Sequence, residues 1–288
     1  MKPRNVALAF LFSLSLFASN WQQQWQLAEG LYKRSFYDEA LVEYQELVKE
    51  AKGEERQEVL WRIADCFEGL KQWAQVESQV KKYLQSEQNS DKKDRATYRL
   101  GLALLSQKKI AQSEAAFSSL SKSATMKDLA KYELAGVYLL QKKDQQGREL
   151  YRDLAANAQD ALVGVYSAFT LANYWRDNNQ SSKAIPLYRQ AIRKGKKLPD
   201  LQQQAYQSLA FSYYRQSEFK ASLRIYDEAF YLFPKLAQKT ENIQNYVHVA
   251  LSAAQASKAL LFLKKSTLRG DELHYLNALS LFAAEKYK

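Results

Sequence analysis

The apolar pattern of this chain recurs six times at nearly constant spacing. A small residue, alanine or glycine, returns after gaps of 36, 37, 34, 37 and 38 residues, and we call it the anchor of each copy. The anchors are Ala28, Ala64, Gly101, Ala135, Ala172 and Ala210. Self-similarity with a period of this length is typical of arrays of stacked supersecondary units. The period therefore predicts a repeat protein.

Each copy has the spacing of two helices. A large apolar residue follows the anchor by three positions, and a second set of small or apolar residues follows it by 12, 16 and 19 positions. Intervals of three and four residues put side chains on one face of a helix. Position +16 is bulky or branched in every copy: Tyr44, Val80, Phe117, Tyr151, Tyr188 and Tyr226. One such helix pair cannot bury its apolar face alone, so we expect the pairs to stack into an all-α fold.

Three segments carry the pattern most clearly: 27–47, 98–117 and 209–234. They resemble tetratricopeptide repeats, and the resemblance extends over most of 27–234. It implies an all-α, right-handed α-solenoid of stacked antiparallel helix pairs with a concave groove that binds proteins. We assign about six clear repeats to 21–236, and to 237–288 a degenerate seventh repeat followed by an unfinished or capping helix anchored on Ala278.

The first 20 residues differ from the array. Lys2 and Arg4 precede a run of twelve mostly apolar residues, 6–17, and small or polar residues follow. This order is typical of a secretory signal peptide, and the run is shorter than the ~20 residues that span a bilayer. A buried or amphipathic N-terminal helix is the alternative. No cysteine of the lipobox type lies near the predicted cleavage site at Ala18. We expect a periplasmic or secreted protein, and the repeat style is similar to that of cell-envelope members of the family.

The chain is basic, with a formal net charge of +11. Such an excess favours acidic or anionic partners. Seven basic residues fall five to eight positions after their anchors, in the turns expected within the first four repeats: Lys33, Arg34, Lys71, Lys108, Lys109, Lys142 and Lys143. Equivalent turns of a stack lie along one edge, so the spacing predicts a basic ridge. The ridge is either a solvated edge or a contact surface for an acidic protein, an anionic envelope polymer or a lipid surface.

Partner-binding candidates lie on the first helix of each repeat. Aromatic residues occupy the position three before the anchor in five copies, and by resemblance this side of the helix lines the groove. Aromatic side chains are enriched at binding hot spots, although packing between helices is the competing interpretation. With residues one and four past the anchors, the candidates are Trp25, Glu29, Tyr32, Trp61, Asp65, Tyr98, Tyr132, Phe169, Asn173, Arg176 and Tyr214.

Other functions find little support in the sequence. The two histidines, His248 and His274, belong to no metal or nucleophile motif, and the nine glycines form no phosphate loop. We therefore expect no enzyme activity, no metal and no cofactor. Zinc-finger and basic-zipper spacings are absent from the sequence, which argues against nucleic acid as a partner. The sequence predicts a non-catalytic interaction scaffold of the bacterial cell envelope, and binding of an anionic polymer or membrane surface through the ridge is the alternative.

Overall fold

A computed structural model describes residues 20–286 of the chain. Within these residues every regular element is helical, which confirms the predicted all-α repeat fold. The predicted signal peptide, residues 1–20, lies outside the described residues except for Asn20. The chain divides into two compact units, 1–147 and 148–288, each of which is described by itself.

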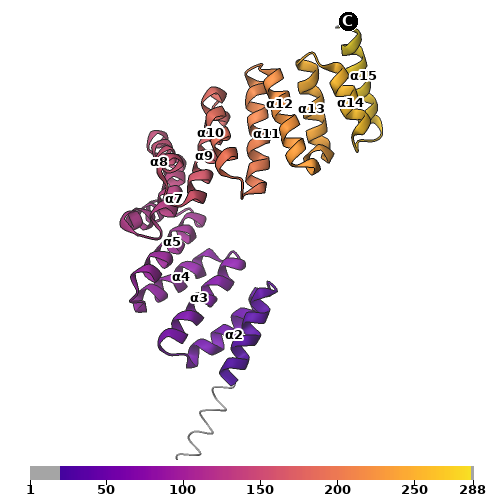
Figure 1. Cartoon of the computed structure of the whole chain (residues 1–288). Coiled ribbons are helices and arrows are strands. Elements are labelled where there is room, and N and C mark those ends of the chain that lie inside the picture. Colours follow the sequence, from indigo (N-terminus) through magenta and orange to yellow (C-terminus); the bar gives the residue numbers. More distant parts are fainter. Residues whose placement is uncertain (1–19, 287–288) are drawn as a thin grey trace, which may run out of the picture. The chain divides into compact units, whose positions relative to one another are not determined.

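Seven helix pairs follow one another along residues 20–265. Their first helices are residues 20–33, α3 (Gly53–Gly69), α5 (Ser90–Ser106), α7 (Lys127–Leu140), α9 (Ala161–Asp177), α11 (Pro199–Arg215) and α13 (Thr240–Ser252). Their second helices are α2 (Tyr37–Glu50), α4 (Trp73–Ser86), α6 (Ile110–Ser119), α8 (Asp144–Asn157), α10 (Ser181–Lys194), α12 (Phe219–Leu232) and α14 (Ala256–Lys265). Within unit 2, α11 to α14 lie side by side and alternate in direction (Figure 1).

Three further elements complete the described chain. A 3₁₀ turn, η1 (Leu120–Lys122), extends α6, and another, η2 (Pro234–Gln238), lies between α12 and α13. The last helix, α15 (Asp271–Lys286), packs against α14 and α13. The boundary between the two units falls inside α8.

The small anchors allow the two helices of a pair to approach closely. Ala28, Ala64, Ala135, Ala172 and Ala210 are all at most 1% exposed. Where position +12 is serine, its hydroxyl donates to the carbonyl oxygen of the anchor: Ser113 to Gly101 at 2.9 Å and Ser222 to Ala210 at 2.8 Å. The residues at +16 are likewise buried, and each contributes roughly 1.5–3 kcal/mol. The residues at the spaced positions found in the sequence therefore form the face along which the two helices of each pair pack.

The turn inside each pair has one geometry in all seven copies. The residue at +7 has a φ between 56° and 64° and is never glycine: Ser35, Lys71, Lys108, Lys142, Asn179, Ser217 and Ala254. The amide at +8 donates to the carbonyl at +3, as Phe36 does to Leu31 and Gln255 to Ala250. The amide at +7 donates to the carbonyl at +4. These two bonds are the Schellman motif, which satisfies carbonyls left unpaired at a helix C-terminus.

The seventh pair keeps this turn although its sequence departs from the pattern. Ala254 stands at +7 if Val247 is counted as the anchor, and Ala259 and Leu263 then fill positions +12 and +16. Both are at most 1% exposed. Valine at the anchor position concealed this register in the sequence.

The anchor predicted for the last helix, Ala278, stays a prediction, because no second helix that it could face follows α15 within the described residues. Ala278 is exposed, whereas Leu276 and Ser280 are fully buried in α15. Leu281 and Phe282 are 54% and 68% exposed. Leu276 belongs to the same buried cluster as Leu263 and Leu268, so this side of α15 packs on the preceding helix pair.

Candidate partner-binding surfaces

The predicted aromatic residues pack mainly within their own repeats. The ring at three before the anchor meets a ring of the second helix edge-on or tilted: Trp25 with Tyr44 at 5.6 Å, Trp61 with Tyr83 at 5.3 Å, Tyr98 with Phe117 at 5.7 Å and Phe169 with Tyr188 at 5.9 Å between centroids. All four rings of the first helices, and Tyr132, are half-buried. Such pairs stabilise a core beyond their buried area. The packing interpretation therefore accounts for much of this pattern, although each ring stays partly exposed.

In unit 1 the predicted acidic residues belong to a chain of ion pairs across three repeats. We call Glu29, Arg62, Asp65, Arg99 and Glu68 the charge ladder. Arg62 Nε lies 2.7 Å from Glu29, and Arg62 Nη1 lies 3.2 Å from Asp65. Arg99 Nη1 lies 2.7 Å from Asp65, and its Nη2 lies 2.8 Å from Glu68. Charges of alternating sign thus connect the first helices of neighbouring repeats.

Aromatic rings and burial strengthen the coupling within the charge ladder. The Arg99 guanidinium lies 4.8 Å from the centroid of the Trp61 ring, and that of Arg62 lies 5.8 Å from the Tyr32 ring. Burial raises the pKa of the Asp65 carboxyl, while the two guanidiniums oppose the rise. The ladder holds its acids in place, so a partner that binds Glu29 or Asp65 must compete with an arginine of the chain itself.

Two hydroxyl donors extend this polar network. The Tyr44 hydroxyl donates to Glu29 at 2.7 Å, and burial together with this bond raises the pKa of Tyr44. The Tyr98 hydroxyl donates to Glu133 at 3.2 Å. Burial raises the pKa of Glu133, and the bond from Tyr98 partly opposes it. Tyr98, predicted to bind a partner, is therefore also a link between the third and fourth repeats.

Trp61 lines a small hollow on unit 1. The hollow has a volume of about 200 Å³, and Tyr83 forms part of its wall beside Trp61. Glu54, Glu58, Lys92 and Arg95 contribute charges of both signs. The accessible part of the Trp61 ring therefore faces a mixed polar rim.

Unit 2 has a larger hollow on the face formed by its first helices, and we call it the unit 2 hollow. Its volume is about 450 Å³. Its lining comes from α9, α11, α12, α13 and the chain before α13: Arg176, Gln207, Ser208, Phe211, Tyr226, Lys239, Glu241, Asn242 and Asn245. Phe211 is 45% exposed, and Asn245 is exposed. Of the predicted binding residues, Arg176 lies in this hollow.

Hydrogen bonds fix the polar wall of the unit 2 hollow. Arg176 Nη1 donates to Ser208 Oγ at 3.0 Å, and its Nη2 lies 2.8 Å from Asp177. Gln207 Nε2 donates to Asn242 Oδ1 at 2.7 Å, and Asn242 Nδ2 donates to the carbonyl of Leu236 at 2.9 Å. The wall is thus positioned before any partner arrives, while the side-chain amide of Asn245 has no hydrogen bond within the described part of the chain.

Three other predicted residues, Asn173 and Tyr214 of unit 2 and Tyr32 of unit 1, have local partners. Asn173 Oδ1 accepts from the Tyr188 hydroxyl at 2.7 Å. Tyr214 is 36% exposed, and its ring lies 5.4 Å from that of Phe219. Tyr32 lies 5.6 Å from Tyr37. Their predicted role in binding is not tested by these contacts.

The basic ridge is exposed at all seven positions. Three of its lysines occupy the left-handed turn position itself: Lys71, Lys108 and Lys142. Two others are paired with the preceding repeat: Lys109 Nζ lies 2.7 Å from Glu77, and Lys143 Nζ lies 3.6 Å from Glu114. Unit 1 as a whole holds 22 basic and 19 acidic residues. The ridge therefore has less uncompensated charge than its lysines alone indicate.

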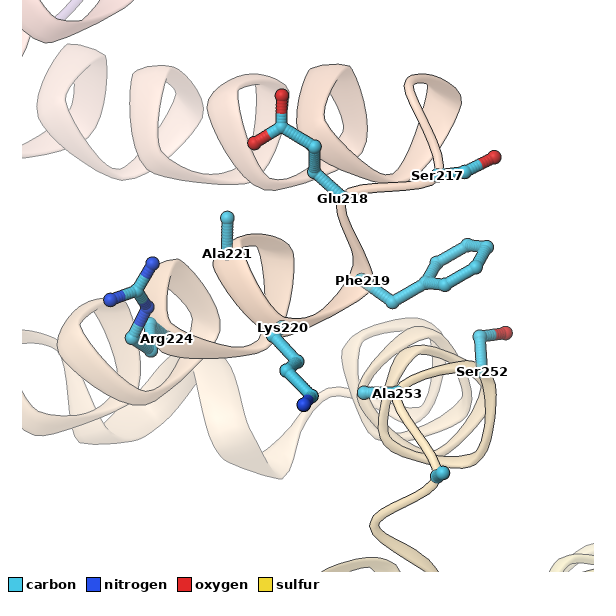
Figure 2. A pocket seen from close by; sticks show the side chains of 9 residues that line it. Ser217, Glu218, Phe219, Lys220, Ala221, Arg224, Ser252 and Ala253 are labelled. Atoms are coloured by element: carbon cyan, nitrogen blue, oxygen red, sulfur yellow. The ribbon is translucent and has the colours of Figure 1, made fainter.

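A third hollow lies at the turns of the sixth and seventh repeats. It has a volume of about 460 Å³, and it includes Lys220, Arg224 and Phe219. Figure 2 shows the Phe219 ring over the helix that carries Ser252 and Ala253, with Glu218 pointing away from Lys220. The lining of this hollow combines two cations, the carboxylate of Glu218 and one apolar ring.

Metal and membrane-spanning features were also sought in the described residues. No group of three or more histidine, cysteine or acidic side chains suited to a metal ion occurs in residues 20–286. Among the helices of the same residues, none has the length and apolar character needed to span a membrane.

No family model matches the chain, and no curated protein matches it. Solved structures do. The C-terminal part of a TPR repeat-containing protein from Cytophaga hutchinsonii is 12% identical, with 90% of this chain and 98% of that chain covered and a TM-score of 0.61. A tetratricopeptide repeat protein from Parabacteroides merdae is 10% identical, with 91% and 99% covered and a TM-score of 0.54. The apo form of RapI is 13% identical, with 92% and 86% covered and a TM-score of 0.56.

This chain has the tetratricopeptide-repeat fold. Structural likeness at these identities concerns the fold and leaves the partner open. The tetratricopeptide register also shows which residues the sequence reasoning missed. Position −2 faces the same side as the predicted residues and is polar in all seven pairs: Gln26, Arg62, Arg99, Glu133, Thr170, Ser208 and Asn245. Aligning that position would have found both arginines of the charge ladder and two residues of the unit 2 hollow.

Proposed function

We propose that this tetratricopeptide-repeat protein is a non-catalytic interaction scaffold and that the unit 2 hollow binds a segment of a partner protein. The observation that carries the proposal is the hollow itself, with its exposed Phe211 and its preformed polar wall. Preorganised side chains lower the entropy cost of binding. An exposed aromatic ring next to fixed polar groups is the usual arrangement of a binding hot spot.

The chemistry of the wall suits an extended polypeptide. Every residue of such a segment presents an amide donor and a carbonyl acceptor, apart from the missing donor of proline. Asn245 and Gln207 each offer both donor and acceptor groups, which can pair with that backbone. Arg176 and Lys239 supply positive charge on the rim, and Glu241 supplies one negative charge. We infer a segment that is mainly polar and has an acidic residue near Lys239, since Arg176 is already paired with Asp177.

Structural neighbours support a scaffold that works through protein contacts. Among them is a chain of the APC/C hetero-tetramer Cut9–Hcn1, 12% identical, with 88% of this chain and 48% of that chain covered and a TM-score of 0.51. That structure is an assembly of proteins. The shared fold is compatible with a role in protein contacts.

For the location of the protein we propose the bacterial cell envelope. Support comes from the order of basic, apolar and small residues in 1–20. Export would make the protein periplasmic or secreted. Fractionation of cells followed by N-terminal sequencing tests this: we expect a mature chain that begins near Ala18 in the envelope fraction. An uncleaved chain in the cytosol contradicts the proposal.

Partner binding can be tested by site-specific photocrosslinking. A benzoylphenylalanine replaces Phe211, and in a matched control it replaces the exposed Ser182 on the second helix α10. We expect one protein to crosslink at position 211 in intact cells and not at position 182. Equal capture at both positions contradicts binding in the hollow.

The captured segment is then titrated against purified variants. Phe211→Ala and Asn245→Ala should each weaken binding by about tenfold, the effect of a hot-spot loss of ~1.4 kcal/mol. Ser182→Ala should bind within about twofold of the native protein. If the two hollow variants bind like the native protein, the hollow is not the site.

A further inference from the structure

The positive charge of the chain is concentrated in unit 2. Unit 2 holds 20 basic and 12 acidic residues, so it accounts for +8 of the total of +11. The ridge predicted from the sequence lies in unit 1, where the charges nearly balance. A surface that attracts anions is therefore to be sought in unit 2.

Much of this excess lies in three successive connections between repeats. Segments 193–200, 231–241 and 264–272 hold nine basic and four acidic residues. All nine basic residues are exposed and form no ion pair within the described part of the chain. Lys194 and Arg269 donate to backbone carbonyls, and Lys239 lines the unit 2 hollow, which leaves six without such a role. We call these six the basic edge: Arg193, Lys196, Lys197, Lys235, Lys264 and Lys265.

The three connections lie next to one another because the helix ends that precede them are packed together. Ile192 at the end of α10 packs on the cluster of Tyr206, Ala229 and Leu236, which joins it to the end of α12. Phe230 of α12 stacks on Phe262 of α14 with centroids 5.6 Å apart. The ends of α10, α12 and α14 thus follow one another along one edge of unit 2.

Large apolar side chains are exposed among these cations. Tyr231 is 84% exposed and Leu232 is 46% exposed at the end of α12, directly before the connection that carries Lys235. Leu261 is 55% exposed on α14, one turn before Lys264 and Lys265. Exposed tyrosine and leucine between lysines match the interface of a bilayer, where apolar groups enter the headgroup boundary and cations meet lipid phosphates.

Independently of the hollow, we propose that the basic edge, with Tyr231, Leu232 and Leu261, docks unit 2 on a membrane surface that contains anionic phospholipids. Unpaired lysines on flexible stems, spread over three connections, suit a surface of diffuse negative charge. A purely charged polymer would leave the three apolar side chains without a role. Basic residues in the last turns of α10 and α14 also interact favourably with the negative ends of their helix dipoles. Lys196, Lys197 and Lys235 lie beyond the helix ends, where this interaction fades.

Vesicle cosedimentation of the full chain tests the proposal. The vesicles contain phosphatidylglycerol mixed with phosphatidylcholine, and vesicles of phosphatidylcholine alone serve as the neutral comparison. We expect binding to the anionic vesicles only. The edge variant reverses the charge at four positions: Lys196→Glu, Lys197→Glu, Lys264→Glu and Lys265→Glu. This variant should have a partition coefficient between anionic vesicles and water that is lower by at least about tenfold.

A matched variant separates the basic edge from net charge. The matched variant reverses four exposed ridge lysines of unit 1: Lys33→Glu, Lys71→Glu, Lys108→Glu and Lys142→Glu. It changes the net charge by the same amount as the edge variant, and its vesicle binding should stay within about twofold of that of the native protein. Circular dichroism confirms that each variant is folded. The proposal is overturned if the ridge variant loses as much vesicle binding as the edge variant. It is also overturned if the native protein binds neutral and anionic vesicles equally well, or binds neither kind of vesicle.

The apolar residues decide between a membrane and an acidic macromolecule. Tyr231→Ser with Leu232→Ser should lower vesicle binding by about fivefold or more, since both side chains lose their insertion into the headgroup boundary. The same variant should bind polyglutamate as the native protein does. If it keeps full vesicle binding, the edge is a site for charge alone, and the membrane proposal fails.

Discussion

At the residue scale, the left-handed turn position shows a conflict between backbone hydrogen bonding and the conformational preference of a residue with a side chain. The C=O groups at a helix end need partners, and the turn supplies them through two backbone bonds. The cost is a residue with positive φ that carries a Cβ atom, which is roughly 1–2 kcal/mol less favourable than in the right-handed region. All seven pairs accept this cost without glycine.

Ala254→Gly should therefore stabilise the protein by ~0.5–1 kcal/mol, because glycine adopts this φ without strain. Ala278→Gly is the matched control, since Ala278 is exposed within α15 and glycine there should destabilise by a similar amount. Urea unfolding followed by circular dichroism measures both. Loss of stability in the Ala254 variant would contradict this account of the turn.

Glu77 gives the clearest pH dependence of a single residue. Hydrogen bonds from Lys109 and then Lys81 lower its pKa from 4.5 to about 2. A carboxyl whose pKa is lower in the folded chain than in the unfolded chain stabilises the fold at any pH above its unfolded-state pKa. This stability is lost as the pH falls from the unfolded-state pKa through the folded-state pKa. The loss should therefore occur between pH 4.5 and about 2.

Glu77→Gln should reduce the slope of stability against pH in that window. The variant should also be less stable than the native protein at pH 7, since the ion pairs with Lys109 and Lys81 are lost. Thermal unfolding at a series of pH values measures both effects. Glu46→Gln is the control, because Glu46 pairs with Lys49 on an exposed helix face. Parallel curves for native protein and the Glu77 variant would exclude the assigned role.

At the element scale, stability depends on how closely the two helices of a pair approach. Position +12 lies against the anchor in the third and sixth pairs, where its serine bonds to the anchor carbonyl, and in the fourth pair it is Gly147. A Cβ atom added there would lie 2.8 Å from the carbonyl oxygen of Ala135 and 2.8 Å from Leu139. The backbone oxygen cannot turn away as a side chain can, so α7 and α8 would have to separate.

Gly147→Ala should accordingly destabilise the protein by roughly 1–3 kcal/mol, the range for overpacking. Gly30→Ala is the matched control: its added Cβ would meet nothing within 4 Å, and alanine should stabilise that helix by ~0.5–1 kcal/mol. Chemical denaturation measures the free energy of unfolding of both variants and of the native protein. Equal effects of the same sign would contradict the close approach at Gly147.

At the scale of the whole molecule, the two units differ in how they use charge. Unit 1 is nearly balanced and couples its repeats through the charge ladder. Unit 2 has an excess of eight positive charges. Repulsion among like charges opposes a compact state, and salt weakens both repulsion and exposed ion pairs.

Added salt should therefore act on the two units in opposite directions. Between low and high sodium chloride, the opening free energies of amides in unit 2 should rise relative to those in unit 1 by ~0.5 kcal/mol, the scale of screened surface pairs. Hydrogen exchange resolved by peptide mass spectrometry measures this for both units in one sample. A uniform response would indicate that the charge imbalance does not affect stability.

The sequence determined the helix pairs, their register in the first six copies and the residues that face each other inside a pair. These follow from local spacing, because a helix places residues three and four apart on one face whatever surrounds it. Buried Tyr44, Phe117 and Tyr188 were recognised for this reason. The seventh pair was harder to place because valine replaces the small anchor.

Only the tertiary structure decided which side chains of different repeats meet. Arg62 pairs with Glu29 and Arg99 with Asp65 across more than thirty residues of sequence, so no local pattern joins them. The unit 2 hollow and the basic edge likewise combine residues from successive repeats. Periodicity fixes the face on which a residue lies, whereas the packing of neighbouring repeats fixes its partner and its exposure to solvent.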